Sequence, residues 1–200
     1  EDEIDVCTKV TRGYCEMAAH LYGNCIPGGS TNGNEEKDII FTRREPLGVM
    51  VIIIPFNYPV DLYSQKVMPA LVAGNSVIIK PPSYNPLAII RMTQILYEAG
   101  VPKCAVQVVT GKGRVVGNYL CGHHGINAIS MTGSTEVGIS IYKKAAECGG
   151  LISGEHGIGH GKMDYLAAFA GDTSMRLMKG IKEVFDPKMI LNPGKVCYRL

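Results

Sequence analysis

The chain contains no tryptophan, and charged residues make up 19% of its 200 residues, below the share of about 25% that is usual in soluble domains. Lysine and arginine form no block, and the formal net charge is only +2. These features exclude a disordered charged tail and leave no electrostatic footprint for a nucleic-acid partner. The chain also lacks a long apolar run. The longest, Val49 to Pro55, has seven residues and is far too short to cross a membrane.

The cysteines are seven, an odd number, and they are scattered without a Cys-x-x-Cys pair. This pattern disfavours both a disulfide framework and a zinc site, and it favours reduced thiols. The acidic start, EDEIDV, is not that of a signal peptide. We therefore predict a cytoplasmic protein with no bound metal and no membrane or nucleic-acid partner. The first residue is Glu1 rather than Met, as expected for a piece of a longer chain.

Apolar runs alternate with amphipathic segments between Gly48 and about Glu147. The apolar runs predict buried strands at 49–54, 76–79, 105–109 and 126–131. The amphipathic segments predict helices at 61–73, 86–99, 114–121 and 134–146, of which the first two should end at Gly74 and Gly100. Repeated strand–helix–strand units predict an α/β fold, a Rossmann-like parallel sheet with helices on both faces.

Three further segments precede the alternation, and a different kind of sequence follows it. Apolar spacing predicts a helix over 3–22, the residues 23–36 are typical of a loop or hairpin tip, and 39–48 predicts a strand. After Cys148, six glycines and two histidines indicate a loop, which is followed by a helix over 173–184 and a proline-punctuated tail.

Four loops follow the predicted strands, at the sheet edge where ligands of parallel α/β proteins bind. In the first, Asn57 stands between two prolines, and it is either a local cap of a rigid turn or an amide that donates to an oxyanion. In the second, Lys80 is either a solvated surface residue or an ammonium aimed at ribose or phosphate oxygens. The third, residues 110–117, is a glycine-rich turn that does not match G-x-G-x-x-G. In the fourth, Ser134 caps a helix whose free N–H groups would also suit a pyrophosphate.

Together, the order and spacing of these loops resemble the aldehyde dehydrogenase superfamily over about residues 3–147. The stretch FTRREPLGVMVIIIPFNYPVDLYSQKVMPALVAGNSVIIKPP is most similar to the branch that holds non-phosphorylating glyceraldehyde-phosphate, lactaldehyde and succinate-semialdehyde dehydrogenases. The resemblance implies an oxidoreductase that uses NAD or NADP to oxidise a small aldehyde to a carboxylate. It also implies that residues 23–45 form a hairpin arm through which copies of the chain assemble into a homo-oligomer.

The resemblance also implies a set of site residues. Asn57 would be the catalytic amide that polarises the carbonyl of the substrate. The cofactor-binding positions would be Ile54, Pro55, Phe56, Lys80, Ser83, Gly113, Gly117, Ser134 and Val137. NAD-preferring members often carry Glu at the position of Ser83, where its carboxylate repels a 2′-phosphate. With serine there, NADP should be tolerated, and the preference between NAD and NADP stays open.

The family pattern stops near Cys148, before the motifs of the nucleophilic cysteine and the general-base glutamate, so we expect no turnover from the chain alone. The segments GGLISGEHGIGHGK and MKGIKEVFDPKMILNPGKV instead resemble the C-terminal end of FAD-linked oxidases, the glycolate oxidase and D-lactate dehydrogenase group, over about residues 149–196. In that group the position of Glu155 can bind a divalent metal, that of His156 faces the 2-hydroxy acid, and the loop of Asn192 touches the flavin. FAD binding here would therefore need a partner domain.

The chain thus divides into three expected parts. Residues 1–47 form a helix and an oligomerisation arm, 48–148 an incomplete NAD(P)-binding domain, and 149–200 an FAD-linked-oxidase-like segment. Two alternatives to the dehydrogenase stay open, namely a component of an FAD-linked 2-hydroxy-acid oxidase or dehydrogenase and a non-catalytic fusion remnant. The join near Cys148 could be a natural fusion, a truncated remnant or an assembly error between two genes.

Overall fold

The structure, a computed structural model, describes residues 2–29, 33, 35–150, 158, 159, 161 and 163–197, except the side chain of Phe169. The chain divides into two compact units, Glu1–Lys144 and Ala145–Leu200. All seven cysteines are free thiols. Among the described helices, none is both long and apolar enough to span a membrane.

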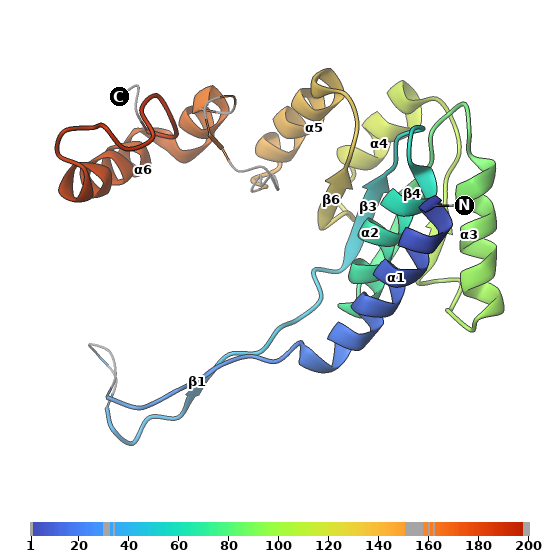
Figure 1. Ribbon diagram of the computed structural model, residues 1–200, viewed down its shortest axis with the longest axis horizontal. Coiled ribbons are helices and arrows are strands. Elements are labelled where there is room, and N and C mark those ends of the chain that lie inside the picture. Colours follow the sequence, from blue (N-terminus) through green and yellow to red (C-terminus); the bar gives the residue numbers. More distant parts are fainter. Residues whose placement is uncertain are drawn as a thin grey trace. The chain divides into compact units, whose positions relative to one another are not determined.

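A four-stranded parallel sheet forms the centre of the first unit, with the strand order β5-β4-β3-β6 (Figure 1). Its strands are β3 (Val49–Ile53), β4 (Ser76–Lys80), β5 (Val106–Val108) and β6 (Ala128–Met131). Ile53 pairs with Lys80 on one side and with Met131 on the other. The last residues of these three strands are therefore level, and the loops that follow them leave from one edge of the sheet.

The connections between these strands are helical. They are α2 (Pro59–Val72), α3 (Leu87–Glu98), and η2 (Gly113–Gly117) with α4 (Asn118–Cys121), and α5 (Thr135–Glu147) follows β6. The chain steps outward from β3 to β5 and then returns past β3 to β6. Since crossovers between parallel strands are right-handed, this reversal places the connecting helices on opposite faces of the sheet. The expected Rossmann-like α/β fold is confirmed.

The core of this unit lies between the sheet and α2 and α3. Its fully or almost fully buried members are Ile52, Ile54, Tyr63, Val67, Val77, Ile79, Ile89 and Val106. The strand members come from the apolar runs that the sequence predicts to be buried. Each large side chain taken out of water contributes about 1.5–3 kcal/mol, which makes this cluster the main source of stability of the sheet.

Glycines end α2 and α3 as predicted. Gly74 has φ +84° and Gly100 has φ +97°, the left-handed conformation that favours glycine just after a helix. The third predicted helix, over 114–121, differs from the structure. Its first part is the π-helical turn η2, and only the four residues of α4 are α-helical. Glycines stand at both ends of η2, and glycine is the weakest helix former after proline, so regular α-helical pairing is weak there.

Helix α1 (Asp2–Met17) packs against α2 and buries Cys7. The short 3₁₀ helix η1 (Ala18–His20) follows, so the helix predicted over 3–22 ends earlier than expected. The chain then forms an arm in which β1 (Cys25–Ile26) pairs antiparallel with β2 (Ile40–Phe41) (Figure 1). The strand predicted over 39–48 is therefore wrong in extent. The residues after Phe41 have no partner strand, and a proline lies among them.

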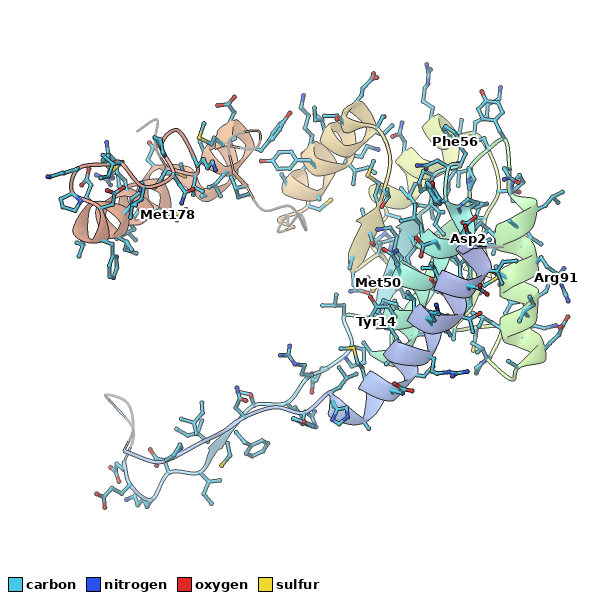
Figure 2. The ribbon with its side chains drawn as sticks, in the orientation of Figure 1. Asp2, Tyr14, Met50, Phe56, Arg91 and Met178 are labelled. Carbon is cyan, nitrogen blue, oxygen red and sulfur yellow. The ribbon has the colours of Figure 1, made fainter. Side chains whose placement is uncertain are left out.

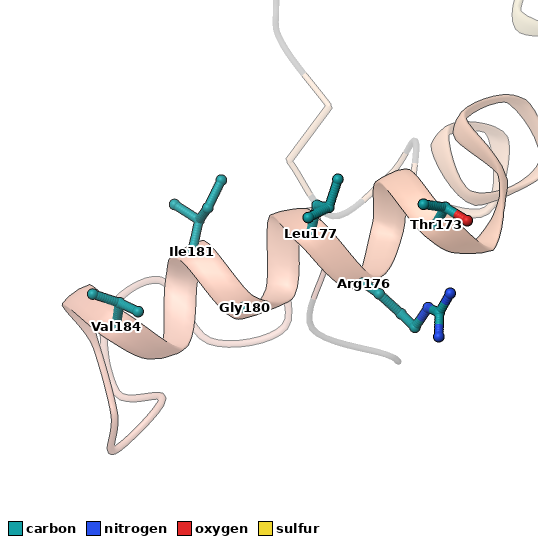
Figure 3. Close-up of a pocket in the computed structure, with 6 residues that line it drawn as sticks. All are labelled: Thr173, Arg176, Leu177, Gly180, Ile181 and Val184. Carbon is teal, nitrogen blue, oxygen red and sulfur yellow. The ribbon is translucent and has the colours of Figure 1, made fainter.

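The second unit contains α6 (Met163–Phe185), which Gly171, with φ +69° and ψ +165°, divides by a kink. The predicted helix over 173–184 is only the part after this kink. Asp186 ends the helix: its carboxylate accepts hydrogen bonds from Lys182 Nζ at 2.7 Å and from the backbone N–H groups of Ile190 and Leu191. An apolar groove of about 490 Å³ runs along one face of α6 (Figure 3).

Candidate dinucleotide site

Backbone hydrogen bonds hold the four loops together where the strands end. The N–H of Ile54 donates to the carbonyl of Lys80 at 3.2 Å, and that of Thr132 to the carbonyl of Ile53 at 3.2 Å. The N–H of Val109 donates to the carbonyl of Ile79 at 2.9 Å. The loops after β5, β4, β3 and β6 thus lie next to one another in that order. The gap between the loops after β3 and β6 is the topological switch point of the sheet, where ligands of such folds bind.

Lys80 is the buried cation of this edge. The residue is 5% exposed, and its ammonium donates one hydrogen bond, to Ser83 Oγ at 3.3 Å. No carboxylate of the described residues forms an ion pair with it. Burial lowers the pKa of Lys80, because removal from water disfavours the charged form. The ammonium therefore keeps two N–H groups for an acceptor that the described chain does not supply.

Ser83 connects two loops. Its hydroxyl accepts from Lys80 and donates to the carbonyl of Gly111 at 3.1 Å, so the loop after β4 is tied to the loop after β5. Gly111 has φ +142°, and a Cβ there would lie 2.7 Å from Val116 Cγ2, so a larger residue would disturb this turn. Sequence reasoning missed this link, because its acceptor is a backbone carbonyl that carries no signal of its own.

The two predicted glycines lie in η2. A Cβ placed on Gly113 would be 3.8 Å from Lys80 Nζ, so this backbone passes directly beside the ammonium. Gly117 is buried at the other end of η2. The structure thus brings Lys80, Ser83 and Gly113 together.

Asn57 lies in the loop that joins β3 to α2. Figure 2 shows its neighbour Phe56 beyond the carboxyl end of β3, whereas Met50 lies near the other end of the strand. Phe56 is 69% exposed and Asn57 is also exposed, while Pro55 is half-buried. Residues 55–57 make no hydrogen bond to the rest of the described chain. The amide of Asn57 is thus free to donate to a ligand at this edge. Ile54 differs, because its side chain is 2% exposed and packs in the core.

The loop after β6 leads into the N-terminus of α5. Ser134 Oγ accepts a long hydrogen bond, 3.4 Å, from the N–H of Val137, as a capping serine does. The N–H groups of Thr135 and Glu136 have no acceptor in the described part of the chain. With the helix dipole behind them, they are suited to bind an anion. Val137 itself is 46% exposed and can offer an apolar surface to a ring.

The N-terminus of α2 is already filled by a carboxylate of the chain. Glu3 Oε1 accepts hydrogen bonds from the N–H of Val60 at 2.7 Å and from that of Asp61 at 3.0 Å. An anionic ligand therefore cannot use the first turn of α2, whereas the N-terminus of α5 is open. The sequence did not point to Glu3, since acidic residues in the first turn of a helix are ordinary and its partners lie 57 and 58 residues away.

The residues predicted from the flavin family belong to the second unit. Glu155 and His156 lie outside the described residues. Asn192 is exposed, has φ +47°, and accepts from Lys195 Nζ at 3.5 Å. The N–H of Val196 donates to the carbonyl of Gly159 at 2.9 Å, which joins the two motifs of this segment. Over the described residues, no group of three or more His, Cys, Asp or Glu side chains could hold a metal ion.

Two family profiles match the chain. The profile of the aldehyde dehydrogenase family matches residues 1–157, and that of the C-terminal domain of FAD linked oxidases matches residues 130–196. Both resemblances seen in the sequence are confirmed. The two matches overlap over residues 130–157, so the second extends further towards the N-terminus than expected.

Several relatives are NADP-dependent glyceraldehyde-3-phosphate dehydrogenases. The one from Pisum sativum is 44% identical over 149 residues, which cover 70% of this chain and 30% of the relative. The one from Triticum aestivum is 44% identical over 123 residues, which cover 62% of this chain and 25% of the relative. The chain thus spans less than a third of the length of these relatives.

Solved structures agree with this assignment. The NADP-dependent glyceraldehyde-3-phosphate dehydrogenase from Bacillus halodurans, complexed with NADP, is 41% identical and has a TM-score of 0.69, over 72% of this chain and 30% of that one. The NAD⁺ complex of an aldehyde dehydrogenase from Bacillus cereus is 31% identical and has a TM-score of 0.70, over 75% of this chain and 29% of that one. With a family profile that matches most of its length and with this fold, the chain belongs to the aldehyde dehydrogenase family.

Proposed function

We propose that the chain binds NADP or NAD across the loops at the carboxyl edge of the sheet, as the coenzyme-binding part of an oxidoreductase that converts an aldehyde to a carboxylate. The observation that carries the proposal is the buried Lys80, whose ammonium is bonded to Ser83 and retains two N–H groups that have no acceptor in the described part of the chain. A bound nicotinamide coenzyme would supply the hydride acceptor of this reaction.

The residues of the edge fit the parts of such a coenzyme. Lys80 and Ser83 would hold the hydroxyls or the 2′-phosphate of the adenosine ribose, and the N-terminus of α5 behind Ser134 would hold the pyrophosphate. Gly113 and Gly117 would let the backbone approach the adenine side. Apolar contacts to the rings would come from Pro55, Phe56 and Val137, whereas the side chain of Ile54 is buried in the core. Asn57 would donate a hydrogen bond to the carbonyl oxygen of a small aldehyde.

NADP is the better-supported coenzyme of the two. Ser83 is neutral, and the ammonium bonded to it has no carboxylate partner among the described residues, so no negative charge described at this position repels a phosphate. The relatives from Pisum sativum and Bacillus halodurans, both NADP-dependent, add to this argument.

Ser83→Glu tests the proposal. A carboxylate there would pair with Lys80 and repel a 2′-phosphate, so NADP affinity should fall by about tenfold or more while NAD affinity is kept or improved. Gln94→Glu, which adds the same charge on the exposed face of α3, is the matched control and should change neither affinity. Calorimetric titration of both coenzymes measures the outcome. Unchanged NADP binding by Ser83→Glu would refute the coenzyme assignment of this loop.

We also propose that the arm joins copies of the chain. Ile39 is 88% exposed and Phe41 is 70% exposed, a cost that an isolated two-stranded hairpin cannot recover in water. A partner copy would cover them. Sedimentation should then show an oligomer for the wild type and a smaller species for Phe41→Glu. A wild type that is monomeric at all concentrations would contradict this assembly.

The second candidate concerns the C-terminal segment. Its match to the FAD linked oxidases, together with the hydrogen bond between Val196 and Gly159 that joins its two motifs, favours an origin in a flavin-linked 2-hydroxy-acid oxidase. A preparation with flavin absorbance would support that function. A colourless preparation that gains thermal stability with NADP would support the dehydrogenase instead.

A further inference from the structure

We propose that Glu3 is a positioning residue of the coenzyme site: its carboxylate fixes the first turn of α2 and, through it, the loop that carries Asn57. The role of Asn57 rests on the proposed function. The argument for Glu3 rests on contacts between α1 and α2 and on what holds the loop at each end.

The first turn of α2 has no cap of its own. The residue before the helix is Tyr58, whose side chain makes no capping hydrogen bond, and Pro59 has no N–H to donate. The N–H groups of Val60 and Asp61 would otherwise be left without a protein acceptor. Glu3 Oε1 accepts from both of them, at 2.7 Å and 3.0 Å, and so replaces the missing cap from a different helix.

The position of the loop before α2 is set by the contacts at its two ends. Residues 55–57 make no hydrogen bond to the rest of the described chain, and Phe56 and Tyr58 are 69% and 59% exposed. At one end, Ile54 is held by the carbonyl of Lys80. At the other end, the first turn of α2 is held by Glu3. The direction of the Asn57 side chain is therefore set by the end of β3 and by the cap that Glu3 provides.

The cap is anchored by packing. Helix α1 lies along α2 and buries Cys7, which keeps the first turn of α1 beside the start of α2. In Figure 2 the start of α1, marked by Asp2, lies on the side of the unit towards Phe56, whereas Tyr14 lies farther away. The carboxylate also meets the positive end of the α2 dipole, which strengthens the contact.

The experiment compares four variants of the full chain, each kept at a temperature at which it is folded. Glu3→Ala removes both acceptor oxygens, and Glu3→Gln removes the charge but keeps one acceptor. Asp5→Asn changes an exposed carboxylate on the same turn of α1 and serves as the control. Cys7→Ala weakens the packing of α1 and retains the Glu3 carboxylate. Amide hydrogen exchange and the side-chain amide resonances of Asn57 are measured by NMR.

In Glu3→Ala, exchange at Val60 and Asp61 should become about fivefold faster than in the wild type, the factor expected for losing a helix cap. Exchange deeper in α2, at Val67, should stay as it is, and the Asn57 amide resonances should move. Glu3→Gln should give a smaller change in the same direction. Cys7→Ala keeps the Glu3 carboxylate, so it should lower the melting temperature but move these resonances less than Glu3→Ala does, and Asp5→Asn should behave as the wild type.

Two results would overturn the inference: Asn57 resonances that do not move in Glu3→Ala, or resonances that move equally in Cys7→Ala. If Glu3→Ala does not fold, the Asn57 resonances of Glu3→Gln are compared with those of the wild type and of Cys7→Ala in the same way. NADP titration of the wild type is the separate readout of the proposed function. A wild type that binds no NADP would reject that function, while the exchange and resonance data would still decide whether Glu3 positions the loop.

Discussion

Replacing Lys80 with Met should stabilise the free chain and weaken its binding of NADP at the same time. In the free chain Lys80 is 5% exposed, and among the described residues its ammonium donates a single hydrogen bond, to Ser83 Oγ. Met has a similar length and fills the same space without a charge to desolvate. Removing the cation relieves the free chain of that cost, whereas in the proposed NADP complex it would remove a contact to the ribose hydroxyls or the 2′-phosphate.

The magnitudes follow from this count of donors. A buried polar group without its partners costs about 1–3 kcal/mol, and the hydrogen bond to Ser83 contributes about 1 kcal/mol, so the net gain of the variant is about 1 kcal/mol. For a unit of this size that gain raises the melting temperature by about 2–4 °C. A hydrogen bond to a charged group contributes about 1.5–3 kcal/mol, so the loss in NADP affinity should be roughly 10- to 150-fold.

The difference in stability between Lys80→Met and the wild type should depend on pH, and the direction follows from the pKa of Lys80. Burial lowers the pKa of Lys80 from its ordinary 10.5, so the folded chain disfavours the charged form. The free-energy cost of burying the charged ammonium is complete below the lowered pKa, and it disappears as the pH rises from that value through 10.5. The stability advantage of Lys80→Met should therefore shrink over this range.

Urea unfolding followed by circular dichroism, with calorimetric titration of NADP, measures both effects. Lys9→Met, which removes an exposed lysine of α1, is the matched control and should change neither quantity. A Lys80→Met chain that is less stable than the wild type, or one that binds NADP with unchanged affinity, would refute this account of the ammonium.

Further predictions concern the stability of the chain and the order of its C-terminal tail. The Thr93 hydroxyl donates to the carbonyl of Ile89, so the Tyr63 hydroxyl must donate to Thr93 Oγ1. In urea unfolding, Tyr63→Phe should lower the free energy of unfolding by about 1 kcal/mol, and Thr93→Val should lower it by about 1–3 kcal/mol, because Thr93→Val leaves the buried Tyr63 hydroxyl unpaired. Equal losses in the two variants would contradict this hydrogen-bond direction. Burial raises the pKa of Tyr63 to about 12, so Tyr63 contributes stability below pH 10 that is lost as the pH rises through 12, and this loss should be absent from the pH profile of Tyr63→Phe. Gly48→Ala should lower the melting temperature by several degrees, since Gly48 has φ +117° and a Cβ would meet the Asn127 side chain at 2.4 Å; an unchanged melting temperature would show that this turn relaxes. The hydrogen bond from Lys182 lowers the pKa of Asp186, so the order of the C-terminal tail should be lost as the pH falls through that lowered pKa. Proteolysis should detect the same loss at neutral pH in Asp186→Asn, and a tail that is equally resistant in the variant and in the wild type would contradict this cap.

The two central strands of the sheet could be predicted from the sequence because each has buried residues on both faces and therefore contains a continuous apolar run. Val49–Ile53 and Ser76–Lys80 are such strands, and glycines mark the ends of the helices next to them. The arm could not be predicted in detail, since a strand exists only where a partner is present, and β2 finds one over two residues. No local pattern in the sequence specifies such a partner.

The site was predictable to the extent that it depends on strand ends. Lys80 ends β4, Ser83 follows it, and Gly113 follows the neighbouring β5, so parallel pairing alone brings them to one edge. The contacts that were missed join distant parts of the chain or use the backbone. Ser83 donates to a carbonyl, and Glu3 reaches amide groups 57 and 58 residues away. Spacing along the sequence does not encode such contacts.

The central claim is that four loops at one edge of the sheet form a single dinucleotide site, and NMR titration of the chain with NADP tests it most directly. We predict that shifts of the backbone amides concentrate at residues 54–58, 80–84, 110–117 and 132–138. Amides at the opposite edge, next to Asn75 and Asn127, should stay in place and serve as the internal control. Shifts spread equally over both edges, or none at all in a folded chain at millimolar NADP, would contradict the claim.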